Sequence, residues 1–262
     1  MEVRLFPNSL RPGVGLKPRR EAQRPLLPQH ARHCPVLEAG SALGFMVHPP
    51  LESHESYVVE FLGEGKYQFT FFVGGANNKW EPIFAMAMTL PLGGIGVIKE
   101  DVTFITRNPP MSAEEAKLFA RIFFVPEDLG TPAGAVTLRG ATNFRTPAGW
   151  DTVYTPVLNN IERPVAPMLV IRVETDWYAH ESEFRYVLLP GEGISGTRDL
   201  PIGQAFFVPR EEITMRDCAE SELAEIRRSR EEFFREKAAS RVKTPYGLWY
   251  SPHYLRQSRE QK

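Results

Sequence analysis

The sequence predicts a mainly β (α+β) fold: an antiparallel β-sandwich or a distorted barrel with a short mid-chain helix and a C-terminal helix. Of its 262 residues, 20 are Gly and 23 are Pro, which is too many for a helical bundle. Runs rich in aromatic and β-branched residues recur between these turn residues, as in short strands. A hydrophobic content of 42% and a charged content of 24% are those of a globular chain with a sizeable core.

Residues 1–33 are expected to form a basic N-terminal arm rich in Pro and Arg. They carry seven Lys or Arg against two Glu, although the whole chain has a net charge of only −1. The run Val3-Arg4-Leu5-Phe6 could add an edge strand to a sheet. The rest of the arm has no sustained period. It is either mobile or wrapped around the core, and binding of a phosphate or an acid is the alternative.

Residues 34–216 are expected to form the β-rich core domain. Gly63-Glu64-Gly65 lies between two alternating apolar runs, which predicts a β-hairpin. Ser112 and Glu115 have the spacing of a capping box. We therefore expect a helix of about three turns that begins there and ends before Pro126.

Residues 217–262 are expected to form a C-terminal helix followed by an aromatic and basic tail that packs on the core. The longest helical pattern of the chain covers 220–239, with its large apolar residues near one face. Asp217 or Ser221 would cap this helix at its N-terminus.

Charge and cysteine usage restrict the class of protein. The small net charge argues against a nucleic-acid partner recognised through the electrostatics of the whole molecule. The two cysteines, Cys34 and Cys218, are far apart in sequence and fit a reducing compartment. No apolar run approaches the ~20 residues of a membrane span, so we expect a cytoplasmic protein. The sequence leaves the cofactor and the oligomeric state unknown.

A Pro-Ala-Gly turn is the first candidate binding element. It places Arg145 and Trp150 on its two shoulders, where a guanidinium and an indole can hold an acidic or planar ligand. Asn159 and Asn160 add amide groups a few residues later. The alternative is a tight hairpin with Trp150 packed in the core.

The run Leu169–Trp177 supplies candidate acid and base groups. If it is a strand, Arg172, Glu174 and Asp176 share one face, and Trp177 lies on the opposite face. Two carboxylates on one face can act as acid and base or bind a hard metal ion. The alternative is that they form salt bridges with Arg172 and Arg185 at an exposed surface.

His180 follows Asp176 by four residues. Together with a remote histidine, His54 or His48, the pair could form a two-His-one-carboxylate metal site. This spacing is common by chance, so the metal stays unknown. The candidate catalytic residues are therefore Asp176, Glu174 and His180, and the candidate ligand-binding residues are Arg145, Trp150, Asn159, Asn160, Trp177 and Arg185.

Two short motifs also resemble a bacterial family of unknown function. They are RTPAGW at Arg145–Trp150 and ETDW at Glu174–Trp177, with an early Cys34-Pro35 and a late Val208-Pro209. The resemblance covers roughly residues 33–210, and Ala148 stands where the family has a second proline. It implies that Arg145, Trp150, Asn160, Glu174, Asp176 and Trp177 act as one constellation, and it carries no activity with it.

Two functions follow as hypotheses, and whether the protein is an enzyme is left open. The first is a small-molecule site in a β-rich fold, with acid/base or metal-assisted chemistry on an acidic or aromatic metabolite. The second is a non-catalytic binding or scaffold module that acts through the N-terminal arm and the C-terminal tail.

Overall fold

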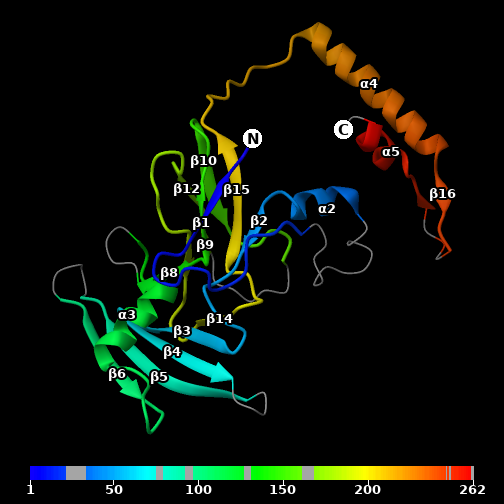
Figure 1. The fold of residues 1–262 in the computed structure, drawn as a ribbon. Helices are drawn as coiled ribbons and strands as arrows, with labels where there is room; N and C mark the ends of the chain where they lie inside the picture. The colour runs from blue at the N-terminus through cyan, green and yellow to red at the C-terminus, as the bar shows by residue number, and fades with distance from the viewer. Residues whose placement is uncertain are drawn as a thin grey trace. The chain divides into compact units, whose positions relative to one another are not determined.

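The computed structural model describes residues 1–21, 34–74, 79–91, 97–126, 131–160, 168–245, 247 and 249–260. The chain divides into two compact units, Met1–Arg210 and Glu211–Lys262. Among these residues, the first unit holds three sheets of four or five strands and a two-stranded ladder, and the second holds a small hairpin. Every strand pair of the described ranges is antiparallel, as the sequence predicted (Figure 1).

The largest sheet of the first unit has five strands in the order β14-β3-β4-β5-β6 (Figure 1). The predicted hairpin joins β3 to β4, and Glu64 in its turn has a φ of 51°. Aromatic side chains from the sheet are buried in the core of the unit. The strands are β3 (Glu55–Gly63), β4 (Lys66–Gly74), β5 (Trp80–Thr89), β6 (Lys99–Phe104) and β14 (Gly193–Thr197).

Helix α3 (Ala113–Phe123) packs against this sheet. Ser112 Oγ accepts a hydrogen bond from Glu115 N, and the Glu115 carboxylate accepts one from Ser112 N, so the predicted capping box is confirmed. Phe119 and Phe123 lie 4.8 and 6.0 Å from the Phe71 ring, between centroids. Burial of such rings contributes about 1.5–3 kcal/mol each, which makes this aromatic layer a main source of stability.

Two smaller sheets complete the first unit. One has the order β12-β10-β15-β2 and the other β11-β13-β8-β7. Their strands are β2 (Phe45–Val47), β7 (Phe124–Pro126), β8 (Ala135–Arg139), β10 (Trp150–Thr155), β11 (Met168–Leu169), β12 (Ile171–Val173), β13 (Glu183–Val187) and β15 (Gly203–Pro209). A short helix, α2 (Pro35–Ser41), precedes β2.

The mainly β, antiparallel prediction is confirmed, and its sandwich alternative fits better than the barrel. Each sheet of the described residues has two free edge strands, so none of these sheets closes on itself. The helices of this part of the chain also include none that is long and apolar enough to cross a membrane.

The first 21 residues of the arm pack against the rest of the first unit. β1 (Arg4–Pro7) pairs with β9 (Thr142–Arg145), which confirms the predicted edge strand. Arg11 donates to both carboxylate oxygens of Glu55, at 2.6 and 3.0 Å, and its guanidinium lies over the Phe119 ring. Residues 22–33 of the predicted arm lie outside the described residues.

The second unit contains α4 (Glu220–Ala239), β16 (Val242–Lys243), β17 (Trp249–Tyr250) and α5 (His253–Glu260). The predicted caps Asp217 and Ser221 are wrong, because Ala219 occupies the N-cap position. Glu222 takes over the capping role: its carboxylate accepts from Ala219 N at 2.7 Å and from Arg216 at 2.6 Å. Packing of the tail on the core stays a prediction.

His48 is the most unusual buried residue of the first unit. It follows β2, its side chain is fully buried, and neither ring nitrogen has a hydrogen-bond partner in the described part of the chain. Its backbone oxygen accepts from Ala141 N at 2.8 Å. Burial, with a smaller effect of the Arg19 charge opposed by Asp199, lowers the pKa of His48 from 6.5 to about 4.

This burial predicts a loss of stability in mild acid. Because the folded protein binds the His48 proton less tightly than the unfolded chain, stability is complete above pH 6.5 and falls as the pH drops towards about 4. A shift of this size corresponds to roughly 3 kcal/mol in the free energy of unfolding. Urea unfolding at pH 7.5, 6, 5 and 4.5 measures it.

The variant His48→Leu should remove most of this slope, because it has no proton to take up. The exposed His54 is a matched control, and His54→Gln should keep the wild-type slope. An unchanged slope in His48→Leu would contradict the assignment.

Candidate functional site

The Pro147 turn and the segment ending at Trp177 lie against each other. Gly149 has a left-handed φ of 76°, and Trp150 N donates to Pro147 O at 3.2 Å. The turn is joined to the second segment through buried threonine hydroxyls. Thr175 Oγ1 lies 2.9 Å from Thr146 Oγ1 and 2.7 Å from Thr152 Oγ1. Buried polar groups that satisfy one another in this way fix the two segments in one arrangement.

An ion-pair network lies next to the Pro147 turn. Asp151 on β10 is buried, and its two oxygens accept from Arg210 at 2.6 Å and from Arg172 at 2.6 Å. Arg210, directly after β15, also donates to Asp176 at 2.6 Å. Its backbone N–H donates to Gly149 O at 2.8 Å. Arg210 therefore ties the end of one strand to both candidate segments.

The strand expected to run to Trp177 stops earlier, because β12 ends at Val173. Glu174 and Asp176 instead belong to a turn, in which Tyr178 N donates to Glu174 O at 3.0 Å. Asp176 accepts from Gly149 N at 2.9 Å as well as from Arg210. The Gly149 N–H and the Arg210 charge lower the pKa of Asp176 below its usual value. The carboxylate is thus held ionised and fully paired.

The aromatic residues of the two motifs remain at the surface. Trp150, the first residue of β10, is half-buried, and so is Arg145, which lies opposite Arg4 in the β1–β9 ladder. Trp177 is 63% exposed, and its Nε1 donates to Glu174 at 2.7 Å. The alternative, a tight hairpin with Trp150 packed in the core, is therefore realised only in part, and ligand binding by Trp150 stays a prediction.

His180 and Arg185 gather around a different carboxylate. Both lie near Glu183 on β13, at 3.9 Å from His180 Nε2 and 3.6 Å from Arg185 Nη2. His180 Nδ1 contacts the backbone oxygen of Glu181 at 2.7 Å. No three His, Cys, Asp or Glu residues in the described ranges are grouped as metal ligands would be. A metal site at Asp176 and His180 has no support in this geometry.

Asn159 and Asn160 lie beyond the opposite end of β10. This six-residue strand begins at Trp150 and separates the asparagines from the Pro147 turn by ~20 Å. The Asn159 side chain donates to Leu37 O and Ser41 Oγ, both at 3.1 Å, and so holds helix α2. The two asparagines are therefore not brought to the turn, because β10 carries the chain away from it.

The sequence did not single out Asp151, Arg210 or the threonines that hold the turn. Asp151 directly follows the RTPAGW motif, and Arg210 directly follows the Val208-Pro209 pair. Their positions next to the motifs could have identified Asp151 and Arg210 as candidate site residues. The pairing itself depends on the β10–β15 register, in which Trp150 lies opposite Pro209.

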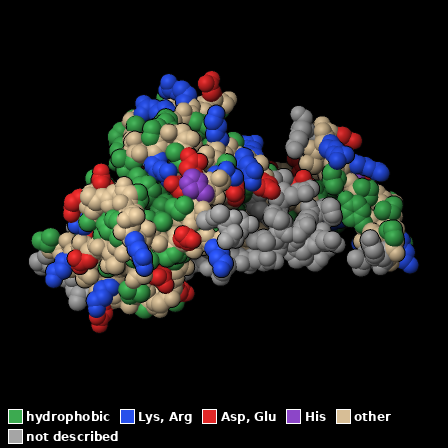
Figure 2. All heavy atoms as spheres, turned by 60° about the horizontal axis from the view of Figure 1, so that its bottom comes forward, with side chains coloured by type: hydrophobic (Ala, Val, Ile, Leu, Met, Phe, Trp, Pro, Cys, Tyr) green, Lys and Arg blue, Asp and Glu red, His purple; other side chains and the backbone are tan. Residues whose placement is uncertain are grey.

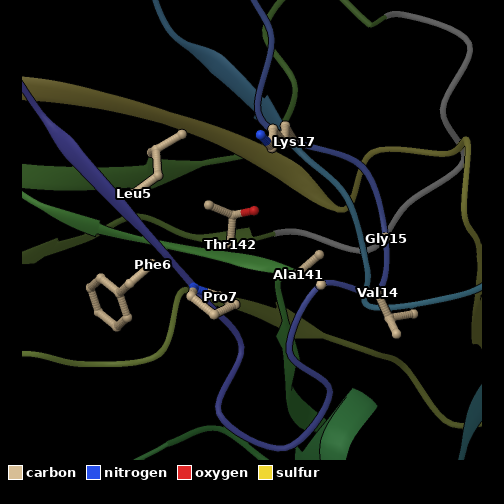
Figure 3. Close-up of a pocket in the computed structure, with 9 residues that line it drawn as sticks. Leu5, Phe6, Pro7, Val14, Gly15, Lys17, Ala141 and Thr142 are labelled. Atoms are coloured by element: carbon tan, nitrogen blue, oxygen red, sulfur yellow. The ribbon is translucent and has the colours of Figure 1, made fainter.

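A hollow lies elsewhere in the first unit, where the N-terminal arm folds over β9 (Figure 3). Its volume is about 260 Å³. The arm supplies two walls, from β1 and from the loop at 13–17, and the start of β9 supplies the third. The lining residues are Leu5, Phe6, Pro7, Gly13, Val14, Gly15, Lys17, Ala141 and Thr142, and none of the predicted site residues is among them.

Gly15 makes this hollow possible. Its φ is 95°, and a Cβ there would come within 2.6 Å of both Ala141 Cβ and Pro49 O. Only glycine lets the arm approach the body so closely in this conformation. Lys17 is the one cationic residue of the lining, and it has no ion-pair partner among the described residues.

Comparison with known proteins adds no family assignment. No family model matches the chain, and no curated protein matches it. The expected membership of a bacterial family of unknown function therefore stays a prediction.

The network predicts that Asp151→Asn destabilises the first unit. The substitution keeps the shape of the side chain but leaves two arginines without their shared carboxylate, one of them half-exposed. We expect a loss of about 1–3 kcal/mol in the free energy of unfolding by urea at pH 7.

A matched control is Glu64→Gln, which breaks the exposed pair between Glu64 and Lys66. It should change stability by less than about 0.5 kcal/mol. Equal effects of the two variants would show that the network does not hold the turn.

Proposed function

We propose that the first unit is a non-catalytic binding protein for a small molecule with an apolar body and an acidic head. The proposed binding place is the hollow between the N-terminal arm and β9 (Figure 3). The observation that carries the proposal is a mostly apolar hollow of about 260 Å³ with a single lysine among its lining residues. The ligand is acidic, as expected from the sequence, but its binding place is this hollow and not the Pro147 turn.

The volume of the hollow and the charge of its lining together limit the class of ligand that it can bind. The volume lies slightly below the usual range of ligand pockets, about 300–1,000 Å³, so a small molecule fits better than a nucleotide or a peptide. Leu5, Val14 and Ala141 offer hydrocarbon contacts. Lys17 supplies a positive charge and Thr142 a hydroxyl. A short-chain or aromatic carboxylate matches this combination.

The state of the acidic residues favours binding over acid/base chemistry. A general acid or base works best with a pKa near the working pH. Burial raises the pKa of Asp151, but hydrogen bonds from Arg210 and Arg172 outweigh it and leave the pKa below its usual value. The Gly149 N–H and Arg210 lower the pKa of Asp176, and both carboxylates already accept two or more hydrogen bonds. Neither therefore offers a proton or a free basic oxygen at neutral pH.

The contacts of the N-terminal arm argue against the arm as a partner-binding element of a scaffold module. Residues 4–7 are paired with β9, and Arg11 is paired with Glu55. These arm residues already use their groups within the first unit. A partner-binding role consequently fits the C-terminal unit better than the arm.

Calorimetric titration with butyrate, hexanoate and benzoate tests the proposal. We expect binding that strengthens from butyrate to hexanoate, because each added methylene buries more apolar surface. Lys17 is exposed, so Lys17→Gln should weaken hexanoate binding by at most about fivefold, the effect of losing one exposed ion pair. Leu5→Trp should abolish it by filling the hollow.

Lys79→Gln is the matched control, since Lys79 is an exposed lysine outside the hollow. It should bind hexanoate as the wild type does. No heat of binding at millimolar carboxylate, or equal losses in Lys17→Gln and Lys79→Gln, would overturn the proposal.

A further inference from the structure

The hairpin of the second unit presents an exposed aromatic ring next to a lysine. β16 and β17 pair antiparallel, with Lys243 directly opposite Trp249. Directly opposed residues of a ladder project on the same face, with Cβ atoms about 5 Å apart. Trp249 is 66% exposed, and Lys243 is exposed as well. An indole and an ammonium group therefore share one open face.

The neighbouring elements hold this hairpin in place. Ser240 Oγ, at the end of α4, lies 2.7 Å from Ser251 Oγ, directly after β17. His253 of α5 contacts the Phe233 ring at 4.9 Å and lies 3.3 Å from a Glu236 carboxylate oxygen. These contacts join the hairpin and α5 to α4, so the exposed face is carried on a folded support.

Positive charge and aromatic rings are concentrated in this part of the chain. Residues 240–260 carry four Lys or Arg against one Glu, whereas the whole chain has a net charge of −1. Tyr250 and Tyr254 are 42% and 44% exposed. On the visible face of the second unit, Lys and Arg side chains lie beside hydrophobic ones (Figure 2). This end of the chain is therefore basic and aromatic, although the molecule as a whole is nearly neutral.

We infer that the open face formed by Lys243 and Trp249, with Arg241 directly before β16, binds single-stranded nucleic acid. Lysine and arginine attract the phosphates, and the exposed rings stack on unpaired bases. Stacking of this kind needs bases that are not held in a duplex, which favours single strands. It also tolerates any sequence, because every base has a flat face.

The mixed character of the face argues against a membrane as the partner. An interfacial membrane element places its apolar residues on one side and its charges on the other. Here the ladder puts Lys243 and Trp249 on the same side. A strand of alternating phosphates and bases matches that alternation of charge and ring, whereas a lipid surface does not.

Fluorescence anisotropy of a 5′-labelled 15-nucleotide oligo(dT), titrated with the full-length protein, tests the inference. We expect binding in 50 mM salt that weakens steeply up to 300 mM salt. Trp249→Ala should weaken it about 5- to 150-fold through lost stacking, and Lys243→Gln should reduce the salt slope by about one. Trp249→Phe keeps a ring and should retain most of the binding.

Matched controls come from the first unit. Trp80→Ala removes a tryptophan that is 45% exposed, and Lys99→Gln removes an exposed lysine of β6. Both should bind the oligonucleotide as the wild type does. No anisotropy change at 50 mM salt, or equal losses in Trp249→Ala and Trp80→Ala, would overturn the inference. So would stronger retention on vesicles with 30% phosphatidylserine than on the oligonucleotide.

Discussion

The arrangement of the first unit around the two motifs depends on Arg210. Its guanidinium donates to Asp151 and Asp176, and its backbone N–H donates to Gly149 O. One residue thus joins the end of β15, the start of β10, the Pro147 turn and the turn before Trp177. A guanidinium can bridge two carboxylates in this way because its several donors are fixed in one plane, which a lysine cannot reproduce.

The same junction uses the acidic side chains that could otherwise act in catalysis. Asp151 and Asp176 hold the chain together, and arginine and backbone N–H groups keep both carboxylates ionised. The hollow that we propose as a binding place lies instead where the arm crosses β9. The proposed role is therefore binding at this hollow, and the polar constellation holds the Pro147 turn against the segment that ends at Trp177.

Much of the fold could be predicted because its signals are local. The Gly63–Gly65 turn, the Ser112–Glu115 capping box and the alternating aromatic runs act through neighbours a few residues apart. The helix cap at Ala219 was missed because a carboxylate three residues later took the role of the expected side chain. The candidate site was predicted only in part, since its members come from segments up to 65 residues apart.

The sequence by itself determined that the chain forms antiparallel sheets and that its N-terminal segment adds a strand. That the Pro147 turn and the ETDW motif act together was expected only from the family resemblance. Only the tertiary structure decided what joins them. Strand order and register place Arg172 and Arg210 beside Asp151 and put Asn159 and Asn160 at the far end of β10. They also bring His180 close to Glu183 instead of Asp176. Spacing along one strand fixes which face a side chain takes, but it carries no information about which distant strand lies alongside.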